Sequence, residues 1–507
     1  MVKGKVKKTI FIAGFMGTGK TTVGKELSRY LGCDFVDTDE LICKDNSVNS
    51  TKEFFSKKSE IFFREEEKRV ISDLVNSGNV VSIGGGSDQN EDVKKILKSQ
   101  NVVRLVAPID EIEKRVGESH ERPLWRKRYE LYKERENRHS LGVKIDTSGR
   151  EVGEVVSLVL RSLRENLEII NKKHNIVFGW GSSSYSVSEK HWVGVIEDNL
   201  SNYSFAFPKG AVQILNFEGS EKSKNYKNVE TMLKSFKDLG LSRDGSVVVM
   251  GGGAISDVVG FASSIHLRGV PVHLIPTTLL SMVDAAIGGK FAVNIDSVKN
   301  LAGSFHLPKS IRIDSSFLPT LPYKDYISGT AEMLKMSCLD KVLFDDFSKD
   351  IQKIKDQNLI VLDSYIKRAV QLKCNYVDDD IYDSKGKRVV LNFGHTVGHA
   401  IELSASKKIR HGEAVSLGML SISKWAEEEG LSESGTFKAI EKNLKSLGLP
   451  TRIDEFDIDV MSFFNSIQKD KKWTSDGLNV VYVEKIGNLK VCNLPNPPAE
   501  KWLDLIS

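Results

Sequence analysis

Two short stretches of the chain carry residues whose types and spacing could do chemistry. The first, GFMGTGKT at residues 14–21, fits the phosphate-loop pattern G-x4-G-K-[ST]. Its glycines let backbone N–H groups surround phosphates, Lys20 supplies positive charge, and the Thr21 hydroxyl can bind Mg²⁺. An apolar strand over residues 9–13 and a helix over residues 21–30 are the context that this loop requires. The stretch therefore predicts a nucleotide site.

The second stretch runs from Arg388 to Glu413 and contains three histidines. His395 and His399 are four apart after an apolar, strand-like segment (VVLNF), so on a helix their imidazoles share a face. With His411 they could contribute to a Zn²⁺ site, which needs several nitrogen or oxygen donors in one place. The pair alone fits equally well a helix face with two hydrogen-bonded histidines. The metal hypothesis therefore depends on the rest of the chain.

Composition limits the remaining classes of function. A chain of 507 residues is too long for one core, so two or three domains are expected. A net charge of +4 argues against a nucleic-acid-binding protein but allows local basic pockets for small anions. Five cysteines without a CxxC motif indicate free thiols in a reducing compartment. With neither a membrane-length apolar run nor a signal-peptide cleavage site, we expect a cytoplasmic protein without membrane partners.

Further candidate groups follow the phosphate loop. A second strand is predicted to end in Asp37-Thr38-Asp39, where one carboxylate could face a metal and the other an acceptor, although a solvated turn is the alternative. Another apolar strand ends in Gly84-Gly85-Gly86, which suggests close approach of backbone to a ligand. Three arginines in charged stretches complete the set: Arg64, Arg122 and Arg138.

Together these motifs resemble shikimate kinase over roughly residues 8–165. The resemblance implies an α/β P-loop kinase with a parallel sheet between helices, which phosphorylates shikimate with ATP and Mg²⁺. Thr21, and Asp37 through water, would hold Mg²⁺, and Lys20, Asp39 and Arg122 would be catalytic. The implied ATP contacts are Gly14, Gly17, Thr18, Gly19, Lys20, Thr21, Thr22, Arg115 and Arg122. The implied shikimate contacts are Asp39, Arg64, Gly85 and Arg138, the last preceded by Asn137 where the family usually has Tyr.

The pattern restarts in the second half of the chain. We predict a kinase domain over residues 1–168, a linker over 169–175, an α/β domain over 176–325 and a helical domain over 326–507. Within the α/β part, the apolar run 246–250 precedes Gly251-Gly252-Gly253. A strand-to-helix turn made of glycines can admit a pyrophosphate at the helix N-terminus, so a dinucleotide site is predicted.

The motifs EKSK (221–224), GGGAISD (251–257), GGK (288–290) and DKK (470–472) occur in an order that resembles 3-dehydroquinate synthase across about residues 176–505. The resemblance implies a Rossmann-like NAD-binding part and an all-helical metal-binding part, with Zn²⁺ (or Co²⁺) held by Glu332, His395 and His411. NAD would contact Glu221, Lys224, Gly252, Gly253, Asp257, Thr277, Thr278, Lys290, Lys299, Phe317 and Thr320. The substrate would contact Arg268, Asp284, Lys290, Asn300, Lys335, Lys373, Arg388, Asn392, His399 and Lys472.

The same resemblance implies the reaction, from 3-deoxy-D-arabino-heptulosonate 7-phosphate to 3-dehydroquinate and phosphate. The metal would polarise an alcohol, NAD would take and later return a hydride, and phosphate would leave by elimination before an aldol closure. The implied catalytic side chains are Lys290, Lys335, Lys373, Arg388 and His399. Arg268 would reach the phosphate from a neighbouring subunit, which implies a homodimer through this half. The acidic turn 378–384 is longer than usual, so which carboxylate acts there stays open.

Four other interpretations were weighed. The chain could be an NTPase fused to an unrelated helical metal-binding domain, a cyclase for another sugar phosphate, a glycerol-dehydrogenase-like enzyme of net oxidation, or a regulatory pseudoenzyme. Intact Lys20, Asp39, Glu332, His395 and His411 argue against the last. Because both resemblances lead to one pathway, we predict a bifunctional enzyme of aromatic amino acid biosynthesis.

Overall fold

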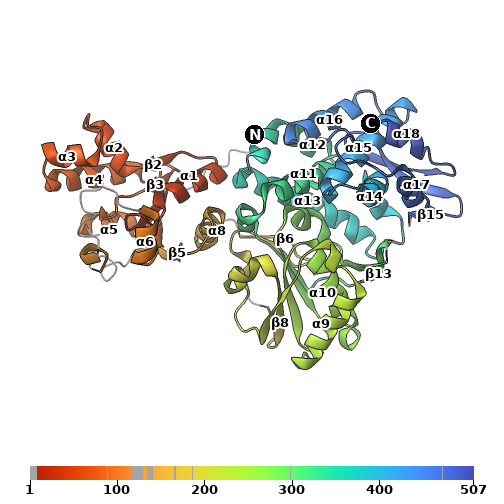
Figure 1. Ribbon diagram of the computed structural model, residues 1–507, viewed down its shortest axis with the longest axis horizontal. Helices are drawn as coiled ribbons and strands as arrows, with labels where there is room; N and C mark the ends of the chain where they lie inside the picture. Colours follow the sequence, from red (N-terminus) through yellow and green to blue (C-terminus); the bar gives the residue numbers. More distant parts are fainter. Residues whose placement is uncertain are drawn as a thin grey trace. The chain divides into compact units, whose positions relative to one another are not determined.

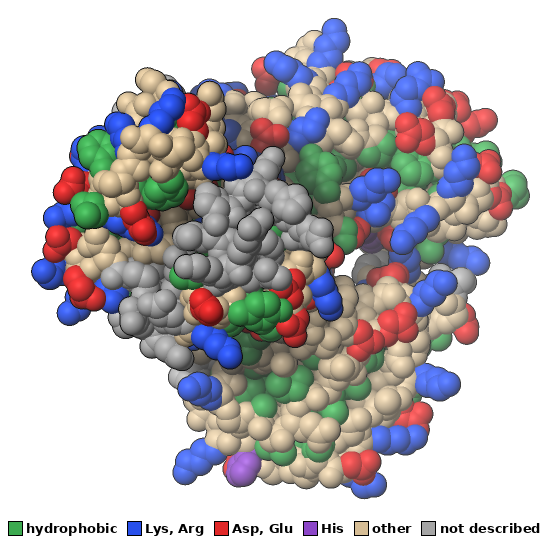
Figure 2. Space-filling view, turned by 60° about the vertical axis from the view of Figure 1, so that its left-hand side comes forward, with side chains coloured by type: hydrophobic (Ala, Val, Ile, Leu, Met, Phe, Trp, Pro, Cys, Tyr) green, Lys and Arg blue, Asp and Glu red, His purple; other side chains and the backbone are tan. Residues whose placement is uncertain are grey.

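The computed structural model describes residues 8–87, 90–116, 129–133, 141–164, 167–184, 187–296, 298–470 and 472–507. The chain forms two compact units (Figure 1). The first comprises Met1–Glu165 with the short segment Asp356–Val361, and the second comprises Asn166–Lys355 and Leu362–Ser507. No helix in the described ranges combines the length and apolar character needed to cross a bilayer. Basic and acidic side chains are interspersed over the face drawn in Figure 2.

The first unit is built on a parallel sheet of strand order β2-β3-β1-β4-β5. The central strand IFIAG is buried along its whole length, as expected where helices cover both faces of a parallel sheet. Its strands are β1 (Ile10–Gly14), β2 (Phe35–Asp37), β3 (Val80–Ser82), β4 (Asn101–Val106) and β5 (Val143–Asp146). Its helices are α1 (Lys20–Leu31), α2 (Thr38–Asp45), α3 (Thr51–Lys57), α4 (Glu60–Leu74), α5 (Glu91–Leu97), α6 (Ile109–Val116) and α8 (Val152–Leu163). This is the predicted parallel sheet with helices on both sides.

One detail of the first unit differs from the prediction. Asp39 lies in the first turn of α2 and not at a strand end. The reason is local, because the Asp37 side chain caps this helix by accepting a hydrogen bond from the Asp39 N–H at 3.1 Å. Asp37 therefore lies at the end of β2, and Asp39 lies in the first turn of the helix that follows it.

The second unit contains a seven-stranded sheet of order β6-β7-β14-β11-β10-β8-β9, in which only β6 is antiparallel to its neighbour. The strands are β6 (Glu168–Asn171), β7 (Ile176–Phe178), β8 (Trp192–Glu197), β9 (Gln213–Phe217), β10 (Ser246–Gly251), β11 (Val272–Pro276) and β14 (Ser310–Ile313). The segment predicted as a linker, 169–175, thus contributes a strand to this sheet. The helical periodicity ends earlier than predicted because Arg164 takes a left-handed conformation (φ 49°) after α8.

Helices and a hairpin complete the α/β part of the second unit. The α-helices are α9 (Tyr226–Asp238) and α10 (Gly253–Ile265), and the hairpin consists of β12 (Lys290–Ile295) and β13 (Val298–Phe305). Short 3₁₀ segments are η3 (Ser182–Ser184), η4 (Asp198–Ala206), η5 (Glu221–Ser223), η6 (His266–Arg268) and η8 (Ser315–Thr320), and η7 (Ser281–Ala285) is a π-helix. The helix α10 packs on β10 and on the hairpin (Figure 1).

The C-terminal part is helical, as predicted, and also carries a small antiparallel sheet that was not predicted. Its helices are α11 (Tyr323–Ser337), α12 (Lys341–Lys355), α13 (Leu359–Asp379), α14 (His395–Ser404), α15 (His411–Glu428), α16 (Thr436–Leu447), α17 (Val460–Gln468) and α18 (Ala499–Asp504). The sheet consists of β15 (Trp473–Thr474), β16 (Gly477–Lys485) and β17 (Asn488–Leu494). The strand expected at VVLNF is wrong, because these residues lie in the 3₁₀ segment η9 (Lys387–Asn392), which starts after Gly386 in a left-handed conformation.

Candidate active sites

The phosphate loop joins β1 to the N-terminus of α1. Gly14 has φ 146°, and a Cβ there would lie 2.4 Å from the Leu105 carbonyl oxygen, so no other residue fits. The Lys20 ammonium donates to the Gly14 carbonyl at 2.9 Å and therefore lies within the loop. The Thr21 hydroxyl donates to Asp37 Oδ2 at 3.3 Å, which brings the two predicted Mg²⁺ groups together. The loop glycines, Lys20 and Thr21 thus form one cradle at the end of β1.

Asp39 lies beside this cradle in a buried position. Its Oδ1 has no hydrogen-bond partner among the described residues. Burial, with the neighbouring carboxylates of Asp37 and Glu67, raises the pKa of Asp39 to about 6, although Lys20 and Arg64 oppose the shift. A carboxyl group with a pKa in this range can exchange a proton with a substrate hydroxyl near neutral pH.

Glu67 is a site residue that the sequence analysis missed. It is fully buried and holds Arg64 through Nη1 at 2.9 Å, and it accepts a hydrogen bond from the Ser87 hydroxyl. A Cβ at Gly84 would lie 2.7 Å from Glu67 Oε1 and 2.8 Å from Asp39 Oδ1, so both carboxylates face the glycine turn after β3. Its spacing of three residues from Arg64 on one helix was the available signal.

The predicted arginines of the first unit have different outcomes. Arg115 donates to Thr147 Oγ1 at 2.8 Å and to its carbonyl at 2.7 Å, and Thr147 Oγ1 lies 3.4 Å from the Thr18 carbonyl of the phosphate loop. Arg115 is thereby held beside the loop. Arg122 and Arg138 lie outside the described residues, so their roles stay predictions.

In the second unit, the glycine turn after β10 is flanked by charged groups. The Gly252 N–H donates to Glu197 Oε2 at 2.9 Å, which places a carboxylate that the sequence analysis missed at the end of β8. Lys224 lies 2.7 Å from Asp257 and donates to Asn300 Oδ1 at 2.7 Å, so three predicted residues converge. These contacts surround the N-terminus of α10, where a pyrophosphate would bind.

Other predicted dinucleotide contacts lie around the same turn. The Thr277 N–H donates to the Gly251 carbonyl at 3.1 Å, and the Thr278 hydroxyl accepts from the Ser281 N–H at 3.2 Å. Glu221 accepts from Asn294 of the hairpin at 3.0 Å. Phe317 is fully buried and packs on Tyr203 with ring centroids 5.7 Å apart, so its side chain belongs to the core. Thr320 ends the same 3₁₀ segment, where its hydroxyl donates to the Phe317 carbonyl at 2.7 Å.

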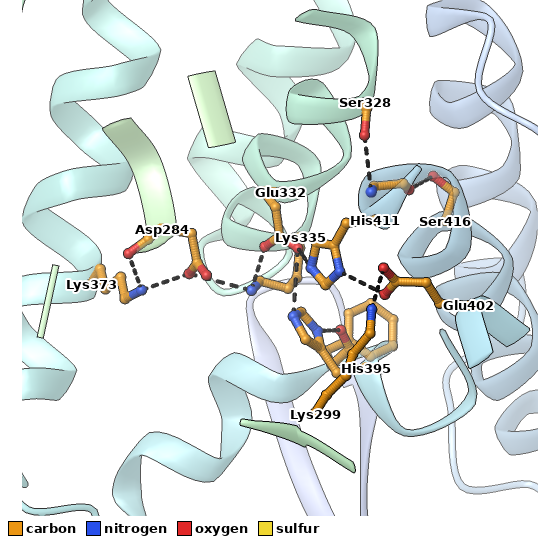
Figure 3. Close-up of polar contacts among 12 residues, drawn as sticks. Asp284, Lys299, Ser328, Glu332, Lys335, Lys373, His395, Glu402, His411 and Ser416 are labelled. Atoms are coloured by element: carbon orange, nitrogen blue, oxygen red, sulfur yellow. Dashed lines mark hydrogen bonds and ion pairs between the residues drawn. The ribbon is translucent and has the colours of Figure 1, made fainter. Parts of the chain in front are cut away.

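Three helices bring a carboxylate and imidazoles together (Figure 3). Glu332 of α11 is fully buried, and its Oε1 lies 3.6 Å from His395 Nε2 of α14 and 3.5 Å from His411 Nε2 of α15. These separations are long for hydrogen bonds, and Oε1 has no hydrogen-bond partner among the described residues. They match the spacing of about 3.3 Å between two ligands that each lie about 2.0–2.1 Å from one tetrahedral zinc ion. The donor set therefore fits a metal.

His399 joins the same cluster. The side-chain nitrogens of His395, His399 and His411 can all lie within 4.8 Å of one another, and the ring of His399 is 5.2 Å from that of His395. His399 also lines a cavity of about 670 Å³ between α14, the hairpin and α17, together with Thr396 of α14, Lys299 and Asn300 of the hairpin, and Asn465 of α17. His399 is thus positioned between the donor cluster and a space for a ligand.

The charges around the cluster favour an ionised Glu332 and a neutral His395, which are the forms that can bind a metal. Burial opposes ionisation of Glu332, but Lys335 and His395 hold its pKa down at about 2. Burial and Lys335 lower the pKa of His395 to about 3, so its imidazole is neutral. His411 differs, because Glu332 and Glu402 overcome its burial and raise its pKa to about 9. A bound cation would displace the proton from His411 Nε2.

Tight packing fixes the helices that carry these donors. A Cβ at Gly412 would lie 1.8 Å from the Ser328 carbonyl oxygen, so α15 can approach α11 only through glycine. The Gly412 N–H also donates to the Ser328 hydroxyl at 3.0 Å (Figure 3). This contact positions His411 against Glu332.

A chain of alternating charges extends from Glu332 across the site. Lys335 lies 2.5 Å from Glu332 Oε2 and 3.6 Å from Asp284, and Lys373 donates to Asp284 Oδ1 at 2.7 Å (Figure 3). Lys472 donates to the Thr396 hydroxyl at 3.1 Å, next to His395. These contacts bring the predicted substrate residues together. Asn392 is the last residue of η9, two residues before the Gly394 that precedes α14.

The acidic turn 378–384 separates into structural and site-facing carboxylates. Asp380 accepts backbone N–H groups of Ser384, Lys385 and Lys387, so it organises the turn. Asp383 lies 2.5 Å from Lys290 and is the carboxylate that faces a predicted site residue. Arg388 donates to the carbonyls of Ile381 and Gly288 from a buried position. Arg268, by contrast, is exposed and left-handed (φ 69°), apart from these groups.

The first unit carries a P-loop kinase site. The second carries a Rossmann-like sheet and a buried Glu/His centre. The chain is therefore a fusion of two enzymes. Residues 16–164 match the family described as shikimate kinase, and residues 214–328 and 329–473 match 3-dehydroquinate synthase N-terminal and C-terminal. The chain is 30% identical over 495 residues to the bifunctional shikimate kinase/3-dehydroquinate synthase of Thermotoga maritima, covering 95% of this chain and 97% of that protein. The chain belongs to this bifunctional family, which confirms the predicted pair of activities in the shikimate pathway.

Two further similarities concern the second half. The 3-dehydroquinate synthase of Saccharolobus solfataricus is 39% identical over 278 residues, which cover 54% of this chain and 78% of that protein. A structure of 2-deoxy-scyllo-inosose synthase complexed with carbaglucose-6-phosphate, NAD⁺ and Co²⁺ aligns with TM-score 0.55 and 26% identity over 62% of this chain and 90% of that one.

Proposed function

We propose that the first unit binds ATP and Mg²⁺ at the loop 14–21 and shikimate at the turn after β3. Asp39 orients or accepts the proton of the attacking hydroxyl, and Arg64, held by Glu67, binds the shikimate carboxylate. The convergence of Lys20, the Thr21–Asp37 pair and Asp39 after the carboxyl ends of β1 and β2 supports this assignment. Arg122 and Arg138 are assigned to the phosphates and to shikimate by resemblance.

We propose that Glu332, His395 and His411 hold a divalent metal, Zn²⁺ or Co²⁺, in the second unit. The observation that carries this proposal is the buried Glu332 Oε1, which has no hydrogen-bond partner in the part of the chain that the structure describes and lies 3.5 and 3.6 Å from two imidazole nitrogens. A metal held there would polarise the alcohol of the substrate, and NAD⁺ bound at the glycine turn 251–253 would supply the hydride acceptor. His399 lines the open side of the metal site.

The cationic side chains of the second unit bind the anionic groups of 3-deoxy-D-arabino-heptulosonate 7-phosphate. Lys335 and Lys373 are already aligned by Asp284, and Lys290 by Asp383, so their ammonium groups are ordered before the substrate arrives. Such preorganisation lowers the cost of fixing a dianionic phosphate and a carboxylate. Arg388, Asn392 and Lys472 complete the proposed contacts.

We propose that the enzyme is a cytoplasmic homodimer that joins through the second unit. Exposed apolar side chains flank Arg268: Ile265, Leu267, Phe305 and Leu307 are 40, 48, 45 and 39% exposed. The segments that carry them lie close together, because the Ser304 and Ser264 hydroxyls hydrogen-bond at 2.6 Å. A second copy on these side chains would bring Arg268 to the neighbouring site, where its guanidinium would bind phosphate.

The test is phosphate release from 3-deoxy-D-arabino-heptulosonate 7-phosphate without ATP, before and after chelation and with NAD⁺ added back. Release that requires metal and NAD⁺ without NADH accumulation is expected. NADH accumulation would instead indicate a net dehydrogenase, and absence of release beside intact shikimate phosphorylation would indicate another sugar phosphate as substrate.

A further inference from the structure

Glu402 is a partly buried carboxylate of α14 that none of the roles above uses. Its side chain is only 15% exposed. Each of its oxygens has its own partner from a different part of the unit: Oε2 lies 3.2 Å from His411 Nδ1, and Oε1 accepts from the Lys299 ammonium at 2.6 Å (Figure 3). A carboxylate buried in this way is retained only where it is paired.

The contact with His411 sets the chemistry of that imidazole. His411 lies between two carboxylates, with Nε2 toward Glu332 Oε1 at 3.5 Å and Nδ1 toward Glu402 Oε2. An anionic acceptor at Nδ1 keeps the proton on this nitrogen and leaves the lone pair on Nε2, the nitrogen that faces the metal position. The negative charge of Glu402 also increases the basicity of the imidazole, so that Nε2 donates its electron pair to a cation more strongly.

The other metal-site histidine has a different partner. His395 Nδ1 faces the neutral Phe393 carbonyl at 3.2 Å. A carbonyl can fix a tautomer, but it carries no charge to increase donor strength. The two histidines are therefore unequal, and His411 is the one whose affinity for metal depends on a side chain.

Lys299 gives Glu402 a second role. It belongs to β13 of the hairpin in the NAD-binding part, whereas Glu402 and His411 belong to the helical part. The ammonium neutralises the partly buried carboxylate and keeps it in one orientation, since both oxygens are then occupied. The hairpin that carries a predicted NAD contact is thereby tied to the metal site.

We propose that Glu402 is a positioning residue of the metal site: it holds His411 with Nδ1 protonated and Nε2 free for the metal, and is itself oriented by Lys299. This inference rests on the proposed metal ligands Glu332, His395 and His411. It concerns the strength of metal binding, so it can be tested without turnover.

The experiment measures Zn²⁺ affinity of the full chain by competition with a chromophoric chelator, without NAD⁺ or substrate. Glu402→Ala removes the acceptor, and Glu402→Gln keeps the volume and a neutral acceptor. We expect Zn²⁺ binding to weaken about 10-fold in Glu402→Gln and about 100-fold in Glu402→Ala. The absorption bands of bound Co²⁺ should shift in Glu402→Gln, because the ligand strength of His411 changes.

Two controls accompany these variants. Glu441→Gln makes the same substitution on α16, where Glu441 pairs with Lys445 at 2.8 Å, and should bind Zn²⁺ like the wild type. Shikimate phosphorylation by the same chain reports the integrity of the polypeptide and should not change.

Each outcome has a definite meaning. Glu402→Gln with wild-type Zn²⁺ affinity and an unchanged Co²⁺ spectrum would overturn the inference, because only packing would then matter. Should Glu402→Ala fail to fold, Glu402→Gln alone decides. A wild-type chain that binds no stoichiometric Zn²⁺, or a His411→Ala chain that binds it equally well, would refute the proposed metal site itself.

Discussion

Glu332→Gln is expected to destabilise the second unit even in metal-free protein. Glu332 is fully buried, and Lys335, which is only 2% exposed, has its ammonium 2.5 Å from Glu332 Oε2. The substitution keeps the volume but removes the nearest negative charge. Lys335 would then keep Asp284 alone as an anionic partner, at 3.6 Å.

The size of the effect follows from that geometry. Removing one partner of a buried ion pair costs about 3–5 kcal/mol, because the other charge is left without compensation. We expect the lower end, about 3 kcal/mol, since Asp284 remains in place. Adding Lys335→Met removes the isolated charge, while Asp284 keeps Lys373 at 2.7 Å. The double variant should therefore recover most of the loss, with a coupling energy of about 2 kcal/mol or more.

Urea unfolding in the presence of a chelator, followed by tryptophan fluorescence, measures these differences. Of the six tryptophans only Trp125 lies in the first unit, so the signal comes mainly from the second. Glu441→Gln, which breaks the Lys445 pair near the surface of α16, should cost less than about 1 kcal/mol and serves as the control. A double variant no more stable than Glu332→Gln would refute the reasoning, since the cost would then come from lost packing.

Three further predictions concern both sites and one buried carboxyl. Lys20→Ala should abolish shikimate phosphorylation and leave phosphate release by the second unit intact, and His411→Ala should do the reverse; a joint loss in either assay would contradict two independent sites. Because the pKa of Asp39 is raised to about 6, kcat/KM of the kinase should be level above that pH and fall about tenfold per pH unit below it, and a profile that stays level down to pH 5 would contradict this role. Asp363 has its pKa raised to about 7 by burial, opposed by the Ser315 hydroxyl bond at 2.6 Å. Its folded-state pKa exceeds the unfolded value near 4, so its stabilising effect is complete below pH 4 and is lost as pH rises through 7. The urea concentration at the unfolding midpoint should therefore decrease as the pH rises from 5 to 8 in the wild type, and should decrease less in Asp363→Asn. An equal decrease in both proteins would show that Asp363 is not the cause.

Local sequence patterns were sufficient for the groups that act through their own short segment. The phosphate loop needs a strand, a glycine turn and a helix in succession, and all three are visible between residues 9 and 30. Spacing suggested His395 and His399, which share a face of α14, whereas the choice of His395 with His411 as ligands came from resemblance. Glu332 entered only through resemblance, since nothing in its own helix distinguishes it from other acidic residues.

The partner carboxylates could not be predicted, because their roles arise from packing between distant elements. Glu197 reaches Gly252 across 55 residues, and Lys299 reaches Glu402 across 103. The strand inside the predicted linker was not foreseen, for a related reason. The short strand β6 gains its hydrogen bonds from β7, and pairing of this kind leaves little trace in a four-residue segment.

One residue of the π-helix η7 serves two lysines. The Asp284 backbone carbonyl accepts from Lys373 at 2.5 Å in addition to the Ile287 N–H at 3.0 Å, and Oδ1 accepts from the same ammonium at 2.7 Å. Lys373 is thereby held twice, and the carboxylate still faces Lys335. Lys335 in turn faces Glu332. Asp284 therefore positions both Lys373 and Lys335, and Lys335 lies between Asp284 and Glu332. The ammonium groups proposed for the substrate and the carboxylate proposed for the metal are therefore parts of one network, so a change at Asp284 should be felt at the metal site through Lys335.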